Sequence, residues 1–188
     1  MRTDGTLWCW GENCYSQLGL GDSDARELPT RVGADSSWAS VTTGSNHSCA
    51  LTAEGALYCW GRNSGGQLGV GGGSSQDAPT EVGSRRDWQQ IDAGGNHTCG
   101  IRTDGTLWCW GSNDIAQLGL GDYETRRAPE QVGTFDGWVE VMAGSSHTCA
   151  LRMDDTLWCW GNNYSGQLAT GEIGSETNEN RPAPQCVE

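Results

Sequence analysis

The chain has 188 residues, enough for one domain with a substantial core, and no apolar run approaches the ~18 residues of a membrane-spanning helix. Its formal net charge is −13, and all eleven basic residues are arginines. Such a surface repels phosphate backbones and anionic lipids, which argues against nucleic acid or membrane as a direct partner. The acidity fits either a basic protein partner or a role in solubility alone. The ten tryptophans indicate a folded chain with bulky core residues.

A seven-residue segment recurs at intervals of fifty residues. It reads GTLWCWG from Gly5 and Gly105, GALYCWG from Gly55 and DTLWCWG from Asp155. A fixed period of this length indicates a repeat architecture in which neighbouring units share their core. We therefore expect a single repeat domain, 1–188, with units at about 1–28 (partial), 29–78, 79–128, 129–178 and 179–188 (partial). Since Met1 occupies the slot of Leu51, the chain is expected to be part of a longer protein, with any export signal upstream.

Each unit is predicted to contain four short strands, and no stretch has a helical period. In the second unit the strands are expected near Pro29–Gly33, Trp38–Thr42, Ser48–Thr52 and Ala56–Gly61. Over the chain this gives fourteen strands, the last near Pro184–Val187. Repeated sets of short strands are typical of a radial β-propeller or a β-solenoid.

The third and fourth strands of a unit form a hairpin whose register can be predicted. Ala53-Glu54-Gly55 suits a type I turn followed by a left-handed glycine. This loop pairs Leu51 with Leu57, Ala50 with Tyr58 and Cys49 with Cys59. Both faces of the hairpin are then apolar, so the sheet must be covered on both sides, as blades packed between blades are.

Six of the nine cysteines are opposed in this register. Opposed residues have Cα atoms roughly 4.5–5.5 Å apart, which suits a disulfide. The expected disulfides are Cys49–Cys59, Cys99–Cys109 and Cys149–Cys159. They imply an extracellular, periplasmic or cell-surface location. Metal binding together with His47, and reduced cysteines in the core, are the alternatives.

The remaining three cysteines have no predicted partner. The strand that would oppose Cys9 is missing, and the pairing of Cys14 and Cys186 stays open.

Catalysis is not expected. His47, His97 and His147 each precede a serine or threonine, but the same group in every unit is typical of a structural hydrogen bond, whereas catalysis needs unlike residues at one site. The glycine runs lack the lysine ending of a phosphate-binding loop. No cofactor and no metal is therefore predicted.

A longer frame of shared residues surrounds the repeated segment. In one unit it comprises Trp38, Val41, Gly44, His47, Leu51, Gly55, Leu57, Trp60, Gly61, Asn63, Gln67, Leu68, Gly69 and Gly71. This frame resembles the regulator of chromosome condensation repeat. Departures are Asp155 at a turn glycine, Ala169 at a loop glycine, and the doubled cysteines, which resemble those of bacterial extracytoplasmic members.

The resemblance implies an all-β fold, a seven-bladed β-propeller of four-stranded antiparallel blades. Seven units of fifty residues would need about 350 residues, so the chain is expected to form an open arc, a fragment of about half a ring. Open blade edges would favour self-association.

The units differ from one another in three windows: residues 14–16, 22–28 and 34–37, with their counterparts. Loops at propeller faces carry function on a rigid frame. The candidate partner-binding residues are Arg85, Arg86, Tyr123, Arg126, Arg127 and Phe135. The predicted function is a non-enzymatic protein-binding scaffold with a partner of unknown identity. The alternatives are regulation of an enzyme, by nucleotide exchange on a small GTPase or by β-lactamase inhibition as the resemblance implies, and a structural surface or adhesion repeat.

Overall fold

The computed structural model describes residues 1–171 and 181–187, which form fourteen strands and no helix. The strands are β1 (Trp8–Gly11), β2 (Arg26–Arg31), β3 (Trp38–Thr43), β4 (His47–Thr52), β5 (Leu57–Gly61), β6 (Gln76–Glu81), β7 (Trp88–Ala93), β8 (His97–Arg102), β9 (Leu107–Gly111), β10 (Arg126–Gln131), β11 (Trp138–Ala143), β12 (His147–Arg152), β13 (Leu157–Gly161) and β14 (Arg181–Cys186). The all-β prediction is confirmed.

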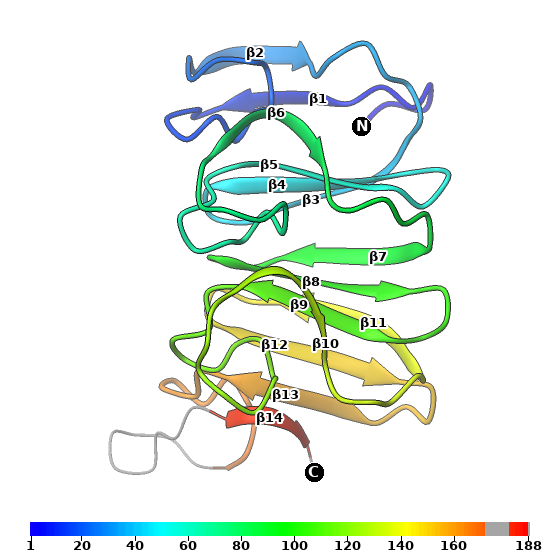
Figure 1. Ribbon diagram of the computed structural model, residues 1–188, viewed down its shortest axis with the longest axis vertical. Helices are drawn as coiled ribbons and strands as arrows, with labels where there is room; N and C mark the ends of the chain where they lie inside the picture. Colours follow the sequence, from blue (N-terminus) through cyan, green and yellow to red (C-terminus); the bar gives the residue numbers. More distant parts are fainter. Residues whose placement is uncertain (172–180, 188) are drawn as a thin grey trace.

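The strands form three four-stranded antiparallel sheets and one two-stranded sheet. The four-stranded sheets have the orders β3-β4-β5-β6, β7-β8-β9-β10 and β11-β12-β13-β14, and β1 pairs with β2. The sheets follow one another from the N-terminal to the C-terminal end of the molecule in an open, unclosed, propeller-like arrangement (Figure 1). The first strand of each sheet contacts that of the next, β3 with β7 and β7 with β11. The predicted open arc of four-stranded blades is confirmed.

The predicted hairpin register is also confirmed. Cys49 lies opposite Cys59 and Leu51 opposite Leu57, and the other two complete hairpins repeat this pairing. Gly55 has the left-handed φ of 79° that the turn requires, and Asp155 adopts 64° at the same place in the last unit.

The sheets are offset from the units of the sequence. The strand expected at Pro29–Gly33 does not pair with β3; it is found as β2 (Arg26–Arg31), which closes the preceding sheet by pairing with β1. Its regular pairing with β1 ends at Arg31, opposite Trp8. Just beyond it, the Val32 N–H donates to the Leu7 carbonyl at 2.9 Å, and Val32 is buried beside Leu7. A unit such as 29–78 therefore spans two sheets, so that each sheet is completed by the unit that follows it.

The core between sheets is built on the second tryptophan of the repeated segment. Trp60, Trp110 and Trp160 are fully buried. Each lies beneath a glycine of the preceding loop; at Gly119, a Cβ atom would come within 2.6 Å of the Trp160 Nε1 atom. The glycines at these positions allow the loop to lie flat on the indole ring.

Trp10 is an exception to the prediction that the tryptophans of this chain are core residues. Its side chain is 59% exposed, although its three counterparts are fully buried. The reason is local: β1 pairs with β2 alone, so the first sheet lacks the two strands that precede β5, β9 and β13 in the complete sheets.

Candidate protein-binding surface on the connector loops

The long loops that join β1 to β2, β5 to β6 and β9 to β10 lie at one end of the strands. We call the surface formed by residues 12–25, 62–75 and 112–125 the connector face; it is on the left in Figure 1. The opposite end, on the right, carries the hairpin turns 53–56 and 103–106 and the links between sheets, such as 82–87 and 132–137. Antiparallel pairing fixes this separation, because successive connections alternate between the two ends.

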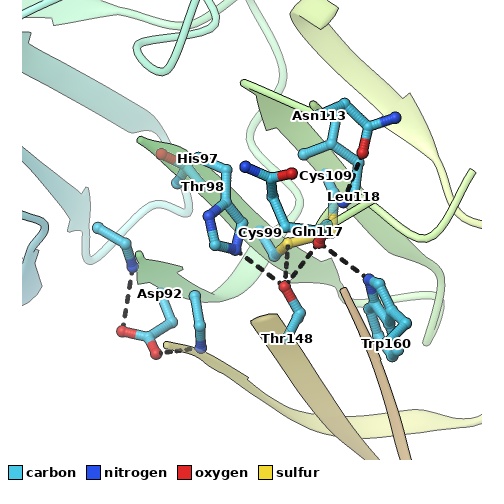
Figure 2. Close-up of a disulfide and its surroundings, with 12 residues drawn as sticks. Asp92, His97, Thr98, Cys99, Cys109, Asn113, Gln117, Leu118, Thr148 and Trp160 are labelled. Carbon is cyan, nitrogen blue, oxygen red and sulfur yellow. Dashed lines mark hydrogen bonds between the residues drawn. A yellow bond between two sulfur atoms is a disulfide. The ribbon is translucent and has the colours of Figure 1, made fainter. Parts of the chain in front are cut away.

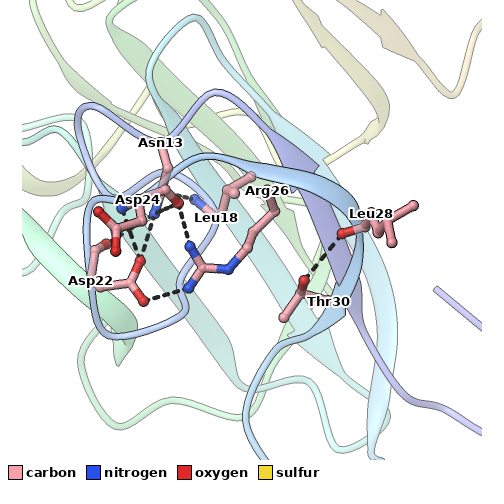
Figure 3. Close-up of polar contacts among 7 residues, drawn as sticks. All are labelled: Asn13, Leu18, Asp22, Asp24, Arg26, Leu28 and Thr30. Carbon is pink, nitrogen blue, oxygen red and sulfur yellow. Dashed lines mark hydrogen bonds and ion pairs between the residues drawn. The ribbon is translucent and has the colours of Figure 1, made fainter.

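A buried asparagine holds each of these three loops, the connectors, on the side that faces the core. Asn13 is fully buried; its Nδ2 atom donates to the carbonyl oxygens of Asp22 and Asp24, both at 3.0 Å, and its Oδ1 atom accepts from the Leu18 N–H (Figure 3). Asn113 repeats this arrangement with the Asp122 carbonyl and the Leu118 N–H. The connector backbone is thereby held rigid while its outer side chains differ from unit to unit.

An ion pair closes the first and third connectors. Arg26 pairs with Asp22 (Figure 3), and Arg126 pairs with Asp122 at 2.7 Å. The hydrogen bond from each arginine lowers the pKa of the aspartate carboxyl. Both pairs are partly exposed, so their contribution to stability is small, and they mainly fix the shape of the loop.

A polar groove of about 430 Å³ lies between the second and third connectors. Its lining includes Arg62, Ser64, Asp114, Glu124 and Arg127. Arg127 crosses to the second connector and donates from Nη1 to the Gly72 carbonyl at 2.6 Å. The groove thus brings together the variable windows of two neighbouring units.

Three of the predicted partner-binding residues lie at this end of the strands: Tyr123 on the connector face, which is 52% exposed, and Arg126 and Arg127 at the start of β10. Arg126 is held by Asp122, by Glu130 and by the Glu124 carbonyl. Arg127 is likewise engaged with Gly72. Both arginines therefore bind connector carbonyl groups, and the exposed members of this group are Tyr123 and Arg127.

The other predicted residues lie at the opposite end of the strands. Arg86 pairs with Glu81, Arg85 pairs with Asp87 at 3.1 Å, and Phe135 packs edge-on against Trp138 with ring centroids 5.5 Å apart. The structure therefore divides the six candidate residues between two ends instead of gathering them at one surface.

Two exposed tyrosines were left out of the predicted set. Tyr15 lies on the first connector with the Arg62 guanidinium over its ring at 5.0 Å, and Tyr164 follows β13. Both fall in or beside the variable window 14–16 or its counterpart, which is the signal that identifies them.

Two of the three repeated histidines, His47 and His97, link neighbouring sheets. His97 Nε2 lies 2.9 Å from Thr148 Oγ1 on the next sheet, and Thr148 Oγ1 lies 2.8 Å from the Gln117 carbonyl, which also accepts from Trp160 Nε1 at 3.0 Å (Figure 2). Because the threonine gives its only proton to the carbonyl, it must accept from the histidine, and we infer that Nε2 carries the proton. His47 makes the same contact with Thr98.

Burial sets the charge of these histidines. It lowers the pKa of His47 to about 4 and that of His97 to about 3, so both are neutral at pH 7. A neutral imidazole that is fully buried and bonded to a core threonine is placed for a structural role.

The cysteines opposed across the hairpins form disulfides in the structure. The pairs are Cys49–Cys59, Cys99–Cys109 and Cys149–Cys159, each with Cα atoms 4.1 Å apart. Cys9, Cys14 and Cys186 are free thiols. Within residues 1–171 and 181–187, no group of three or more histidine, cysteine or acidic side chains is arranged to hold a metal ion.

Comparison with known proteins places this repeat in a family. The model of the regulator of chromosome condensation (RCC1) repeat matches residues 4–51, 54–101 and 104–151. The chain belongs to the RCC1 repeat family. A second RCC1 repeat model matches residues 38–67 and 138–167.

Solved RCC1-type structures share the fold. Human WBSCR16 is 24% identical to this chain, with a TM-score of 0.87. The match covers all of this chain and 50% of the WBSCR16 chain. Yeast RCC1 (Prp20), solved bound to Kap60, is 23% identical with a TM-score of 0.82, over 98% of this chain and 45% of its own. Prp20p from Saccharomyces cerevisiae is 22% identical, with a TM-score of 0.80. The match covers 97% of this chain and 46% of the Prp20p chain, and that structure is described together with the binding properties of Prp20p to Gsp1p and histones. The RCC1-repeat chain thus spans about half the length of these structures. Among its described residues no helix has the length and apolarity to cross a membrane.

Proposed function

We propose that this RCC1-repeat chain is a non-enzymatic scaffold that binds a protein partner through the connector face. The observation that carries the proposal is the contrast within each connector: a buried asparagine fixes the backbone, while the outer side chains differ between units. A rigid frame with variable, exposed tips is the usual design of a binding surface.

The chemistry of the connector face indicates the kind of partner. The first and third connectors carry acidic side chains and no basic ones: Glu12, Asp22, Asp24, Asp114, Asp122 and Glu124. Tyr15 and Tyr123 add exposed aromatic rings of the type found at interface anchors. We therefore propose a basic protein surface as the partner. The description of Prp20p binding to Gsp1p and histones shows that this fold can bind proteins.

The three disulfides support a location in an oxidising compartment, at the cell surface or beyond it. Two alternatives stay predictions. One is regulation of an enzyme, by nucleotide exchange on a small GTPase or by β-lactamase inhibition, as the family resemblance implies; the other is a structural role as a surface or adhesion repeat.

A photo-crosslinking experiment tests the proposal. A benzophenone amino acid replaces Tyr123 on the connector face, and in a matched variant it replaces Leu28, which is more exposed but lies on the outermost strand β2. Both variants are irradiated in the organism that makes the protein. A discrete crosslinked partner at position 123, absent at position 28 and weakened by high salt, supports the proposal. Equal crosslinking at both positions, or none at 123, contradicts it.

A further inference from the structure

A cavity of about 400 Å³ lies beside Arg152 at the end of β12, between the sheet that begins with β7 and the sheet that begins with β11. Phe135, Trp138 and Trp158 line it, and so do the connector residues 119–121. The arginine and the three aromatic residues lie outside the connector face. Binding in this cavity would therefore not depend on a partner at the connector face.

Arg152 has a counterpart in Arg102, fifty residues earlier in the chain. Each of these arginines ends the second strand of its sheet and lies over the rings of two tryptophans, one from the first strand and one from the third. The distances from the guanidinium carbon to the ring centroids are 4.7 Å (Trp88) and 3.6 Å (Trp108) for Arg102, and 4.7 Å (Trp138) and 3.7 Å (Trp158) for Arg152. The two guanidinium groups therefore occupy equivalent places.

The two arginines differ in their counter-ion. Arg102 is 6% exposed and forms an ion pair with Asp87, with 3.8 Å between Arg102 Nε and Asp87 Oδ1. Gly137 stands at the place of Asp87 in the next link between sheets. Arg152 is half-buried and forms no ion pair or hydrogen bond with any residue that the structure describes; its Nε atom is buried without a partner. The charge of Arg152 is therefore left without a carboxylate.

Phe135 takes up part of the space that the missing side chain leaves. Its ring centroid lies 4.2 Å from the guanidinium carbon of Arg152, and a Cβ atom at Gly137 would come within 2.6 Å of the Phe135 ring. Arg152 is thus surrounded by three aromatic rings. Ring faces attract a cation, but they do not replace the oxygen acceptors that the N–H groups at the edge of a guanidinium require.

The fold itself does not account for this arginine. Thr52 stands at the same place in the sheet that begins with β3, so the sheet does not need a guanidinium there. The carboxylate of Asp154 is turned to its own hairpin, where it accepts from the N–H and the hydroxyl of Thr156 at 3.1 and 2.6 Å. A partly buried charge is costly unless an opposite charge or a hydrogen-bond acceptor compensates it.

We propose that this cavity binds a carboxylate ligand through Arg152, with the ligand in the role that Asp87 has beside Arg102. The planar fork of a guanidinium matches the two oxygens of a carboxylate. The rings of Phe135 and Trp158 would contact a flat, apolar body attached to that carboxylate. The carboxylate belongs either to a free small molecule or to an acidic side chain of a protein, and the probes below distinguish these two sources.

The first test is an NMR titration of the isotopically labelled 188-residue chain with benzoate. We expect saturable shifts of the Arg152 Nε–H and Trp158 indole N–H resonances, with a dissociation constant below about 10 mM. The corresponding resonances of Arg102 and Trp108 are the internal control and should not shift, because Asp87 already holds that place. Benzamide, the neutral analogue of the same shape, should bind at least about tenfold more weakly.

A blocked acidic residue, N-acetyl-glutamate N-methylamide, separates the two sources of the carboxylate. If it binds more weakly than benzoate, the ligand is a free small molecule. If it binds more tightly, the carboxylate belongs to an acidic segment of a protein. Either result supports the proposal, whereas inorganic phosphate that binds Arg152 as tightly as the better carboxylate would show an unselective anion site and contradict it.

Two variants complete the test. Arg152→Gln should weaken benzoate binding at least about tenfold. The double variant Phe135→Arg, Gly137→Asp gives this link the residue types of Arg85 and Asp87 and supplies a carboxylate from within the chain. It should fold, because the preceding link carries the same pair, and it should lose benzoate binding to the same extent. Unchanged binding in either variant, equal binding of benzamide, or no saturable shift at Arg152 with either carboxylate would overturn the proposal.

Discussion

Thr148 accepts a hydrogen bond from His97 across the boundary between two sheets, with 2.9 Å between Thr148 Oγ1 and His97 Nε2. The same threonine donates to the Gln117 carbonyl, which also receives the Trp160 indole N–H (Figure 2). One hydroxyl thus joins a strand and a loop of one sheet to a strand of the next. Neighbouring blades are held together by this buried polar link as well as by apolar packing.

The first prediction concerns that link. Thr148→Val keeps the shape of the side chain but leaves the His97 Nε2 proton and one acceptor site of the Gln117 carbonyl unpaired in the core. We expect the free energy of unfolding to fall by about 1–3 kcal/mol, measured by urea denaturation. Thr30→Val is the control, because among the described residues Thr30 Oγ1 bonds only to the Leu28 carbonyl of its own strand, and its effect should stay within about 0.5 kcal/mol. Equal losses for the two variants would contradict the assigned role.

The second prediction is a loss of stability in mild acid. The folded pKa of His47 and His97, about 4 and about 3, lies below the ordinary histidine value of 6.5. Between pH 6.5 and about 4 the unfolded chain therefore binds more protons than the folded chain. Stability is complete above pH 6.5 and falls with pH by up to about 1.4 kcal/mol per pH unit for each of these histidines.

Urea denaturation at several pH values checks this dependence. His97→Gln should reduce the slope between pH 6.5 and 4.5, because it removes one titrating group. The aspartates with lowered pKa, such as Asp22, lose their contribution only as pH falls below their ordinary value of 3.8, so they do not obscure this range. A free energy of unfolding that stays constant from pH 6.5 to 4.5 would refute the prediction.

The third prediction compares two equivalent turns. A Cβ at Gly105 would lie 2.0 Å from the Asp136 carbonyl oxygen of the next link between sheets, whereas Asp155 carries a side chain at the same place in the last unit. Gly105→Asp should destabilise the chain by several kcal/mol, about 2–4, because the left-handed conformation is strained and the link must also move. Asp155→Gly should be neutral or slightly stabilising. Thermal unfolding of both variants measures the difference. Comparable destabilisation by the two substitutions would show that the link 132–137 does not restrict the side chain at position 105.

The fourth prediction concerns the redox state. Protein alkylated directly on isolation from its native source should show three free thiols, those of Cys9, Cys14 and Cys186, out of nine cysteines. Reduction before alkylation should raise the count to nine. Nine free thiols without reductant would place the protein in a reducing compartment and remove the main support for an extracytoplasmic location.

Much of the candidate site was beyond sequence-based prediction. The variable windows identified the connectors, and Tyr123 does project from one of them. The residue types of Arg126 and Phe135 suggested interface anchors equally well, yet Arg126 is bound by carboxylates of its own sheet and Phe135 by Trp138. An arginine that binds a partner and one that closes its own loop have the same sequence signal, because the difference lies in what surrounds them.

The sequence by itself determined the repeat, the strands, the hairpin register and the opposition of Cys49 to Cys59, because a three-residue turn and a period of two fix these locally. Only the tertiary structure decided that β2 completes the sheet before it, that the candidate residues lie at two opposite ends, and that Trp10 is exposed although Trp60 is buried. Identical repeats carry identical local signals, whereas burial depends on which neighbours are present, and that is a property of the assembled sheets.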